Sequence, residues 1–152
     1  MGDERQSVLV VDDDTAVADA YRLLLEEDGD YEVSVANGGP EAMEVVDETF
    51  DVILLDRKMP EMPGDEVLRR VRERGYECAV AFVTAAEPFD GDERLPFDAY
   101  LTKPVDKTTL RAAVDQLTSI EKTGCGDPAK SRPNVPRGSN VVRSESGWEY
   151  VS

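Results

Sequence analysis

The chain has 152 residues, of which 40% are hydrophobic, enough for one domain with an apolar core. Asp and Glu outnumber Lys and Arg by 33 to 17, and histidine is absent, so the formal net charge is −16. A surface this negative repels phosphate backbones, so we expect no direct binding to nucleic acid. Without histidine, a Ser-His-Asp triad and a His-ligated zinc site are excluded.

Residues 7–120 alternate between short apolar runs, which predict buried strands, and segments with helical periodicity. In chain order we expect strands at 8–11, 31–35, 52–55, 80–83 and 99–101. Between and after them we expect helices from 14 to near 29, at 40–46, at 65–74 and from 106. Such alternation predicts an α/β fold, a single doubly wound five-stranded parallel sheet with helices on both faces.

The first predicted helix begins after Asp14, which is a good helix cap. Its expected core-facing side chains recur at helical spacing: Val17, Ala20, Tyr21 and Leu24. Asp106 is expected to cap the last helix in the same way.

Polar residues stand where the predicted strands end. Asp12, Asp13 and Asp14 follow the first strand, and Asp56 follows the third. Thr84 ends the fourth, and Lys103 follows the fifth. Ligands of such sheets bind beyond the carboxyl ends of the strands. Crowded carboxylates repel one another unless a cation lies between them, and Mg²⁺ suits their oxygens. One remaining carboxylate, flanked by cations, could attack phosphorus. Each residue alone has an ordinary structural explanation, but their joint occurrence favours a site.

Four sequence blocks resemble the receiver domain of two-component response regulators and occur in that family's order. They are Val-Leu-Val-Val-Asp12-Asp13-Asp14, Leu-Leu-Asp56-Arg-Lys-Met-Pro-Glu-Met-Pro-Gly64, Val-Thr84-Ala and Tyr100-Leu-Thr-Lys103-Pro. The resemblance covers residues 7–120 and implies the flavodoxin-like receiver fold.

The resemblance implies a role for each matched residue. Asp56 would be the phosphoacceptor, and Mg²⁺ would be held by Asp12, Asp13, Asp56 and the backbone carbonyl of Lys58. The implied partner is a sensor histidine kinase or a phosphotransfer protein, and the output is a conformational change. No enzymatic activity is implied beyond self-phosphorylation and self-dephosphorylation.

Three further residues would respond to the phosphoryl group. The resemblance implies that Thr84 hydrogen-bonds it, that Lys103 pairs with it, and that Thr84 and Tyr100 act as the switch.

The sequence between Thr84 and Lys103 departs from the common receiver pattern. It contains Pro88, Gly91 and Pro96, so we expect the fourth helix, which receivers usually place there, to be reduced or irregular. This stretch is similar to haloarchaeal receivers of the HalX type, and the acid-rich, lysine-poor composition agrees with a halophilic archaeon.

Residues 121–152 differ from the rest in composition. They carry five bases and four acids and are rich in Gly, Pro, Ser and Asn. We expect a disordered tail without a DNA-binding module. The sequence has no apolar run long enough to cross a membrane. Its acidic start does not fit a secretory signal, so a cytoplasmic location is expected.

Two other functions remain open from the residues. Asp12-x-Asp14 after a strand also resembles the nucleophile motif of haloacid-dehalogenase-type phosphatases, although Ala16 stands where that family has Thr or a β-branched residue. A degraded receiver acting only as an interaction domain is the other alternative.

Overall fold

The computed structural model describes residues 6–27, 29, 31–84, 97–103, 105–119, 141–144 and 147–150. Its strands are β1 (Gln6–Val11), β2 (Tyr31–Ala36), β3 (Val52–Leu55), β4 (Ala79–Thr84), β5 (Ala99–Thr102), β6 (Val141–Ser144) and β7 (Gly147–Tyr150). Its helices are α1 (Thr15–Glu26), α2 (Gly39–Val45), α3 (Gly64–Glu73) and α4 (Lys107–Ser119).

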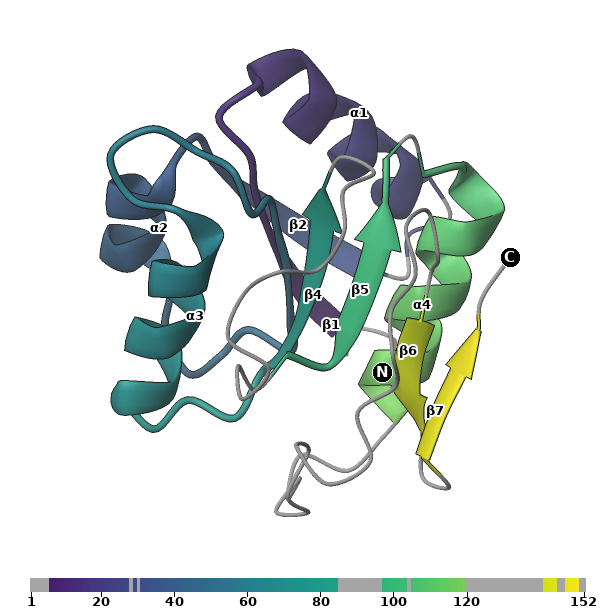
Figure 1. The fold of residues 1–152 in the computed structure, drawn as a ribbon. Coiled ribbons are helices and arrows are strands. Elements are labelled where there is room, and N and C mark those ends of the chain that lie inside the picture. Colours follow the sequence, from purple (N-terminus) through teal and green to yellow (C-terminus); the bar gives the residue numbers. More distant parts are fainter. Residues whose placement is uncertain are drawn as a thin grey trace.

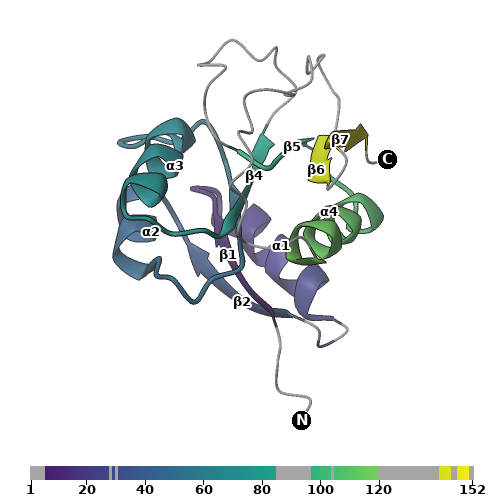
Figure 2. The same cartoon turned by 90° about the horizontal axis from the view of Figure 1, so that it is seen from below.

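The strands form one sheet in the order β2-β1-β3-β4-β5-β6-β7. The first five pair in parallel, which confirms the doubly wound five-stranded sheet. Helices α1 and α4 cover one face of this sheet, and α2 and α3 cover the other (Figures 1 and 2). Because all five strands run the same way, their carboxyl ends lie along a single edge.

The sheet separates two apolar clusters. On one face, β1 and β3 residues pack with α1 and α4, and on the other face their alternate residues pack with α2 and α3. Since both faces are covered, every residue of β3 is buried, as its unbroken apolar run predicts. The core-facing residues of α3 also lie where the periodicity places them, at Val67, Leu68 and Val71.

The predicted apolar stripe of α1 is partly wrong. The buried residues of this helix are Ala18, Tyr21 and Leu25, whereas Ala20 is exposed and Val17 and Leu24 pack only at the margin. Leu23, at 60% exposure, faces solvent. The helix is apolar on more than one side, so packing on the sheet decides which stripe is buried.

A C-terminal hairpin, formed by β6 and β7, extends the sheet beyond β5. Strand β6 pairs antiparallel with β5, setting Val142 opposite Ala99, and β7 pairs antiparallel with β6. The Val142 side chain is fully buried in the cluster that contains Leu110 and Leu117. The expectation of a tail without regular structure is therefore corrected for residues 141–144 and 147–150.

The reduced fourth helix was expected within residues 85–96, which lie outside the described residues. Among the helices that are described, none is long and apolar enough to cross a membrane.

Candidate functional site

Backbone hydrogen bonds fix two of the candidate carboxylates at the carboxyl edge of the sheet. The Asp12 N–H donates to the carbonyl of Ala36 at 3.1 Å, and the Asp56 N–H donates to the carbonyl of Val11 at 2.9 Å. These bonds continue the strand pairing by one residue past the ends of β1 and β3. Asp12 and Asp56 are thus held side by side by the sheet itself.

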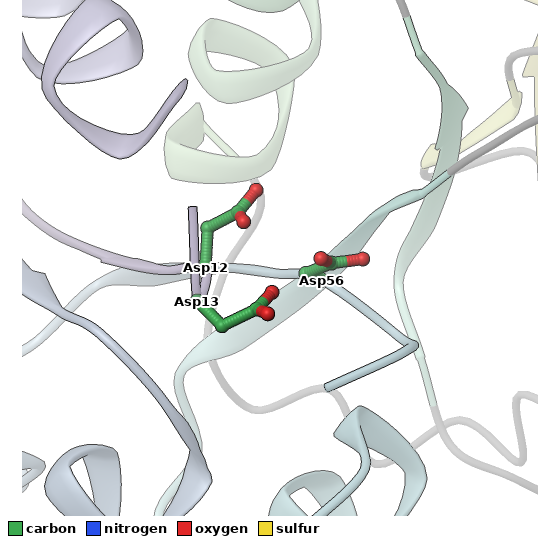
Figure 3. Close-up of side chains that lie close together, drawn as sticks. All are labelled: Asp12, Asp13 and Asp56. Carbon is green, nitrogen blue, oxygen red and sulfur yellow. The ribbon is translucent and has the colours of Figure 1, made fainter. Parts of the chain in front are cut away.

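Asp12, Asp13 and Asp56 form an acidic trio (Figure 3). One carboxylate oxygen from each lies within 4.8 Å of the others. Asp12 is 2% exposed and Asp56 is 7% exposed, while Asp13 faces solvent. Three oxygen donors, one of them open to water, are the chemistry that a hard divalent cation requires, so the residues present fit Mg²⁺.

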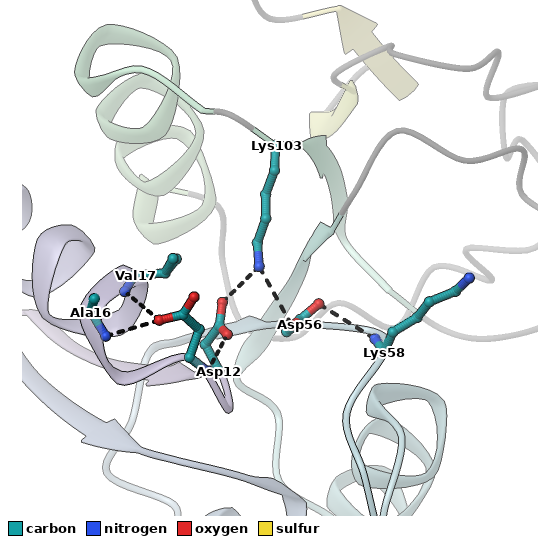
Figure 4. A network of polar contacts seen from close by, with 7 residues as sticks. Asp12, Ala16, Val17, Asp56, Lys58 and Lys103 are labelled. Carbon is teal, nitrogen blue, oxygen red and sulfur yellow. Dashed lines mark hydrogen bonds and ion pairs between the residues drawn. The ribbon is translucent and has the colours of Figure 1, made fainter.

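Lys103 reaches from the end of β5 to Asp12 and Asp56 (Figure 4). Its Nζ lies 2.8 Å from Asp12 Oδ2 and 3.4 Å from Asp56 Oδ2. The Lys103 N–H also donates to the Thr84 carbonyl at 2.7 Å, which ties the lysine to the end of β4. The sequence prediction that these residues meet is confirmed by this geometry.

The pKa values of the two partners reflect this arrangement. Burial raises the pKa of Asp56, and the charge of Lys103 opposes this without cancelling it. Burial lowers the pKa of Lys103, but the hydrogen bond that its ammonium donates to Asp12 and the charges of the nearby carboxylates outweigh burial, so this pKa is raised. The ammonium group therefore stays charged beside the carboxylates.

Asp14 has a structural role. Its carboxylate accepts hydrogen bonds from the N–H groups of Ala16 and Val17, which confirms the predicted helix cap. Its own N–H donates to Asp12 Oδ1 at 2.9 Å and so orients that carboxylate.

Lys58 lies beside Asp56, and its N–H donates to Asp56 Oδ1 at 3.4 Å. The Lys58 side chain is exposed and points away from the carboxylates (Figure 4). The role of its carbonyl as a metal ligand stays a prediction.

Gly64 closes the loop that follows Asp56. Its N–H donates to the carbonyl of Arg57 at 2.8 Å. A Cβ on Gly64 would lie 2.4 Å from the Asp56 carbonyl oxygen, closer than any real contact. The glycine therefore lets the start of α3 approach the backbone of Asp56.

The two switch candidates lie on neighbouring strands, β4 and β5. Thr84 is buried at the end of β4, and Tyr100 of β5 is 2% exposed. The Tyr100 ring packs against Phe82 and Phe97, with centroid separations of 5.9 and 5.7 Å. The structure places both residues near the site, and their switch role stays a prediction.

Sequence reasoning missed Arg57. Its guanidinium pairs with Asp65 through two hydrogen bonds and donates to the Tyr100 hydroxyl. Arg57 lies in the loop after β3 and Asp65 lies in α3, so they share no helix or strand and only the folded loop brings them together.

The family model of the response regulator receiver domain matches residues 8–115. A candidate transcriptional regulator from Haloferax volcanii is 50% identical over 113 residues, which is 74% of this chain and 19% of that protein. The transcriptional regulatory protein DltR from Streptococcus agalactiae is 36% identical over 70% of this chain and 49% of that protein. The chain thus spans about half or less of these two regulators.

Solved structures agree. A CheY-like receiver domain protein from Methanospirillum hungatei has a TM-score of 0.71 at 31% identity, covering 80% of this chain and all of that one. The regulator TrrA from Thermotoga maritima, solved in complex with Mg²⁺-BeF, has a TM-score of 0.65 at 28% identity, covering 74% of this chain and 98% of that one. The match over most of the chain, the shared fold and the acidic edge of the sheet together lead to one conclusion: the chain belongs to the response regulator receiver domain family of two-component systems.

Proposed function

We propose that Asp56 accepts a phosphoryl group from a histidine kinase or phosphotransfer protein in a Mg²⁺-dependent reaction, and that the domain then signals by a change of conformation. Family membership supports this function in outline. The observation that carries it is the acidic trio bridged by Lys103.

The contacts of the two buried carboxylates favour Asp56 over Asp12 as the nucleophile. Both oxygens of Asp12 are engaged at short distance, Oδ1 by the Asp14 N–H at 2.9 Å and Oδ2 by Lys103 at 2.8 Å. The contacts of Asp56 with Lys103 and with the Lys58 N–H are both longer, at 3.4 Å. An oxygen of Asp56 can therefore turn toward an incoming phosphorus at a lower cost in hydrogen bonding.

In the proposed reaction an Asp56 oxygen attacks phosphorus, the new O–P bond forms, and the P–N bond of the donor phosphohistidine breaks. Lys103 neutralises negative charge at the reacting oxygens, and the Thr84 hydroxyl would donate to the transferred group. Mg²⁺ held by Asp12, Asp13, Asp56 and the Lys58 carbonyl would neutralise further charge on those oxygens.

The phosphatase alternative has less support. Asp14, the second carboxylate of its motif, is exposed and accepts two hydrogen bonds from the first turn of α1. That carboxylate is engaged in capping the helix, which leaves it less available for the reaction that the alternative requires.

Acetyl phosphate with Mg²⁺ tests the proposal, with peptide mass mapping to locate the added phosphoryl group. We expect labelling at Asp56 that is lost in Asp56→Asn and with EDTA. The control Asp19→Asn removes an exposed carboxylate of α1 and should label like the wild type. Labelling of Asp56→Asn at the same peptide would contradict the proposal. So would hydrolysis of many phosphomonoesters without an accumulating adduct.

A further inference from the structure

Arg57 joins three elements of the fold next to the site. It follows Asp56 directly, yet its side chain is only 12% exposed. The guanidinium contacts Asp65 in the first turn of α3, the Phe82 ring of β4 and the Tyr100 hydroxyl of β5. Arg57 thus follows Asp56 directly and also reaches Tyr100, the proposed switch residue.

The pair with Asp65 fixes the guanidinium plane. Arg57 Nε lies 2.7 Å from Asp65 Oδ1, and Nη2 lies 3.0 Å from Oδ2. Two parallel hydrogen bonds define both the position and the tilt of the planar group, which a lysine ammonium could not do. The hydrogen bonds that the guanidinium donates to Asp65 raise the pKa of Arg57, so the group is always charged.

The guanidinium of Arg57 also contacts two aromatic side chains, Phe82 and Tyr100. Its carbon lies 5.7 Å from the Phe82 ring centroid, within the range of a cation–π contact. Nη1 donates to the Tyr100 hydroxyl at 3.3 Å. In the paired strands Phe82 lies directly beside Tyr100. Arg57 therefore supports the tyrosine at its polar end while Phe82 packs against its ring.

The backbone of Arg57 is equally constrained. Its carbonyl accepts from the Gly64 N–H at 2.8 Å, and a Cβ on Gly64 would lie 2.9 Å from the Arg57 Cα. The loop after Asp56 is thus closed against the start of α3, with little free space. A displacement of Asp56 must move Arg57, and with it the group bonded to Tyr100.

We propose that Arg57 is a positioning residue that holds the Tyr100 hydroxyl in its buried place and links the tyrosine to the phosphorylation site. The positioning concerns the unphosphorylated protein and stands on these contacts alone. The link rests on the proposed function of Asp56. The two parts can therefore fail separately.

The test uses the full chain with ¹³C-labelled tyrosine rings. The Tyr100 signal is assigned by its loss in Tyr100→Phe, and its exposure is measured with a neutral soluble paramagnetic chelate. Arg57→Met removes the guanidinium but keeps an unbranched chain. Arg57→Lys keeps the charge beside Asp65 but cannot bond Asp65 and Tyr100 together. Arg70→Met is the control, since the Arg70 side chain is exposed on α3 and pairs with Glu66 of the same helix.

We expect the exposed population of Tyr100 to rise about fivefold in Arg57→Met, which corresponds to about 1 kcal/mol, the usual net contribution of one hydrogen bond. Arg57→Lys should show a similar rise, and Arg70→Met none. Unchanged protection in both Arg57 variants overturns the positioning. Equal exposure in Arg70→Met also overturns it, because the loss would then be a general loosening of the fold.

The link between Tyr100 and the phosphorylation site is tested by adding Mg²⁺ and acetyl phosphate to the same samples. Mass spectrometry checks that Asp56 is labelled in the wild type, and absence of labelling there contradicts the proposed function rather than the positioning. Where labelling occurs, the wild-type Tyr100 signal should shift, and the shift should shrink in Arg57→Met at equal labelling. The same shift in both proteins overturns the link.

Discussion

Replacing Lys103 by methionine should reveal the repulsion that this lysine relieves. Its Nζ lies 2.8 Å from an Asp12 oxygen and 3.4 Å from an Asp56 oxygen, and both carboxylates are buried. Removing one partner of a fully buried ion pair costs about 3–5 kcal/mol. Because the Lys103 side chain is 23% exposed and a carboxylate can take up a proton instead, we expect about half of that, about 2 kcal/mol.

The loss of stability in Lys103→Met should depend on pH. Burial already raises the pKa of Asp56, and Lys103 opposes this, so its removal raises the pKa further. A carboxyl group whose pKa is higher in the folded state binds more protons when folded, so stability falls as pH rises through the interval between the two pKa values. The loss in Lys103→Met should therefore be larger at about pH 7.5 than at about pH 5.

Urea unfolding followed by circular dichroism measures this effect, in EDTA at constant salt. Saturating Mg²⁺ should then restore part of the lost stability, because the cation replaces the missing positive charge and binds only the folded state. Lys107→Met is the matched control, since Lys107 pairs with the exposed Glu27 on the surface and should matter little. Equal stability of Lys103→Met and wild type at both pH values would refute the assigned electrostatic role.

Three further changes probe other parts of the fold by the same urea assay. Gly64→Ala should cost about 2 kcal/mol through overpacking against the Asp56 carbonyl and should reduce phosphoryl uptake. Gly38→Ala should be tolerated, because its Cβ would meet only the Pro40 side chain at 3.9 Å, and equal losses at both glycines would contradict this. Asp106→Asn keeps a cap acceptor but cannot ionise. Its hydrogen bonds from Thr109 lower the pKa of Asp106, so wild-type stability should fall relative to the variant as the pH drops below about 4, and parallel pH curves would argue against this. Val142→Ala should cost about 1–2 kcal/mol, and an unchanged midpoint would mean that the hairpin does not pack on the core.

Much of the sheet and of the acidic site could be predicted because the relevant signals are local. The residues of β3 form one unbroken apolar run, and Asp12, Asp56 and Thr84 each follow directly on such a run. Once the strands are parallel, their ends must share an edge, so Asp12, Asp56 and Lys103 meet without any further information. The periodicity of α3 was equally clear because charged residues flank the adjacent Val67 and Leu68 on both sides and separate them from Val71.

The features that could not be predicted depend on contacts between segments that lie far apart in the sequence. In α1 the run Leu23-Leu24-Leu25 allows more than one buried stripe, and only packing on the sheet selects Leu25. The strands of the C-terminal hairpin, Val-Val-Arg-Ser and Gly-Trp-Glu-Tyr, contain no unbroken apolar run like that of β3, although the Val-Val pair and Trp148-x-Tyr150 were a usable hint. The partners of Arg57 lie on three different elements, so no spacing along the chain could have indicated them.

The hairpin has a consequence for how the protein emerges from the ribosome. Strand β5 ends at Thr102 and its antiparallel neighbour begins at Val141, so the two are made about 40 residues apart. At about 5–20 residues per second, some 2–8 seconds separate their synthesis. During that time the outer edge of β5 presents unpaired N–H and carbonyl groups, which invite pairing with strands of other chains. Faster chain elongation, or a ribosomal pause within that interval, should therefore change the ratio of folded protein to aggregate.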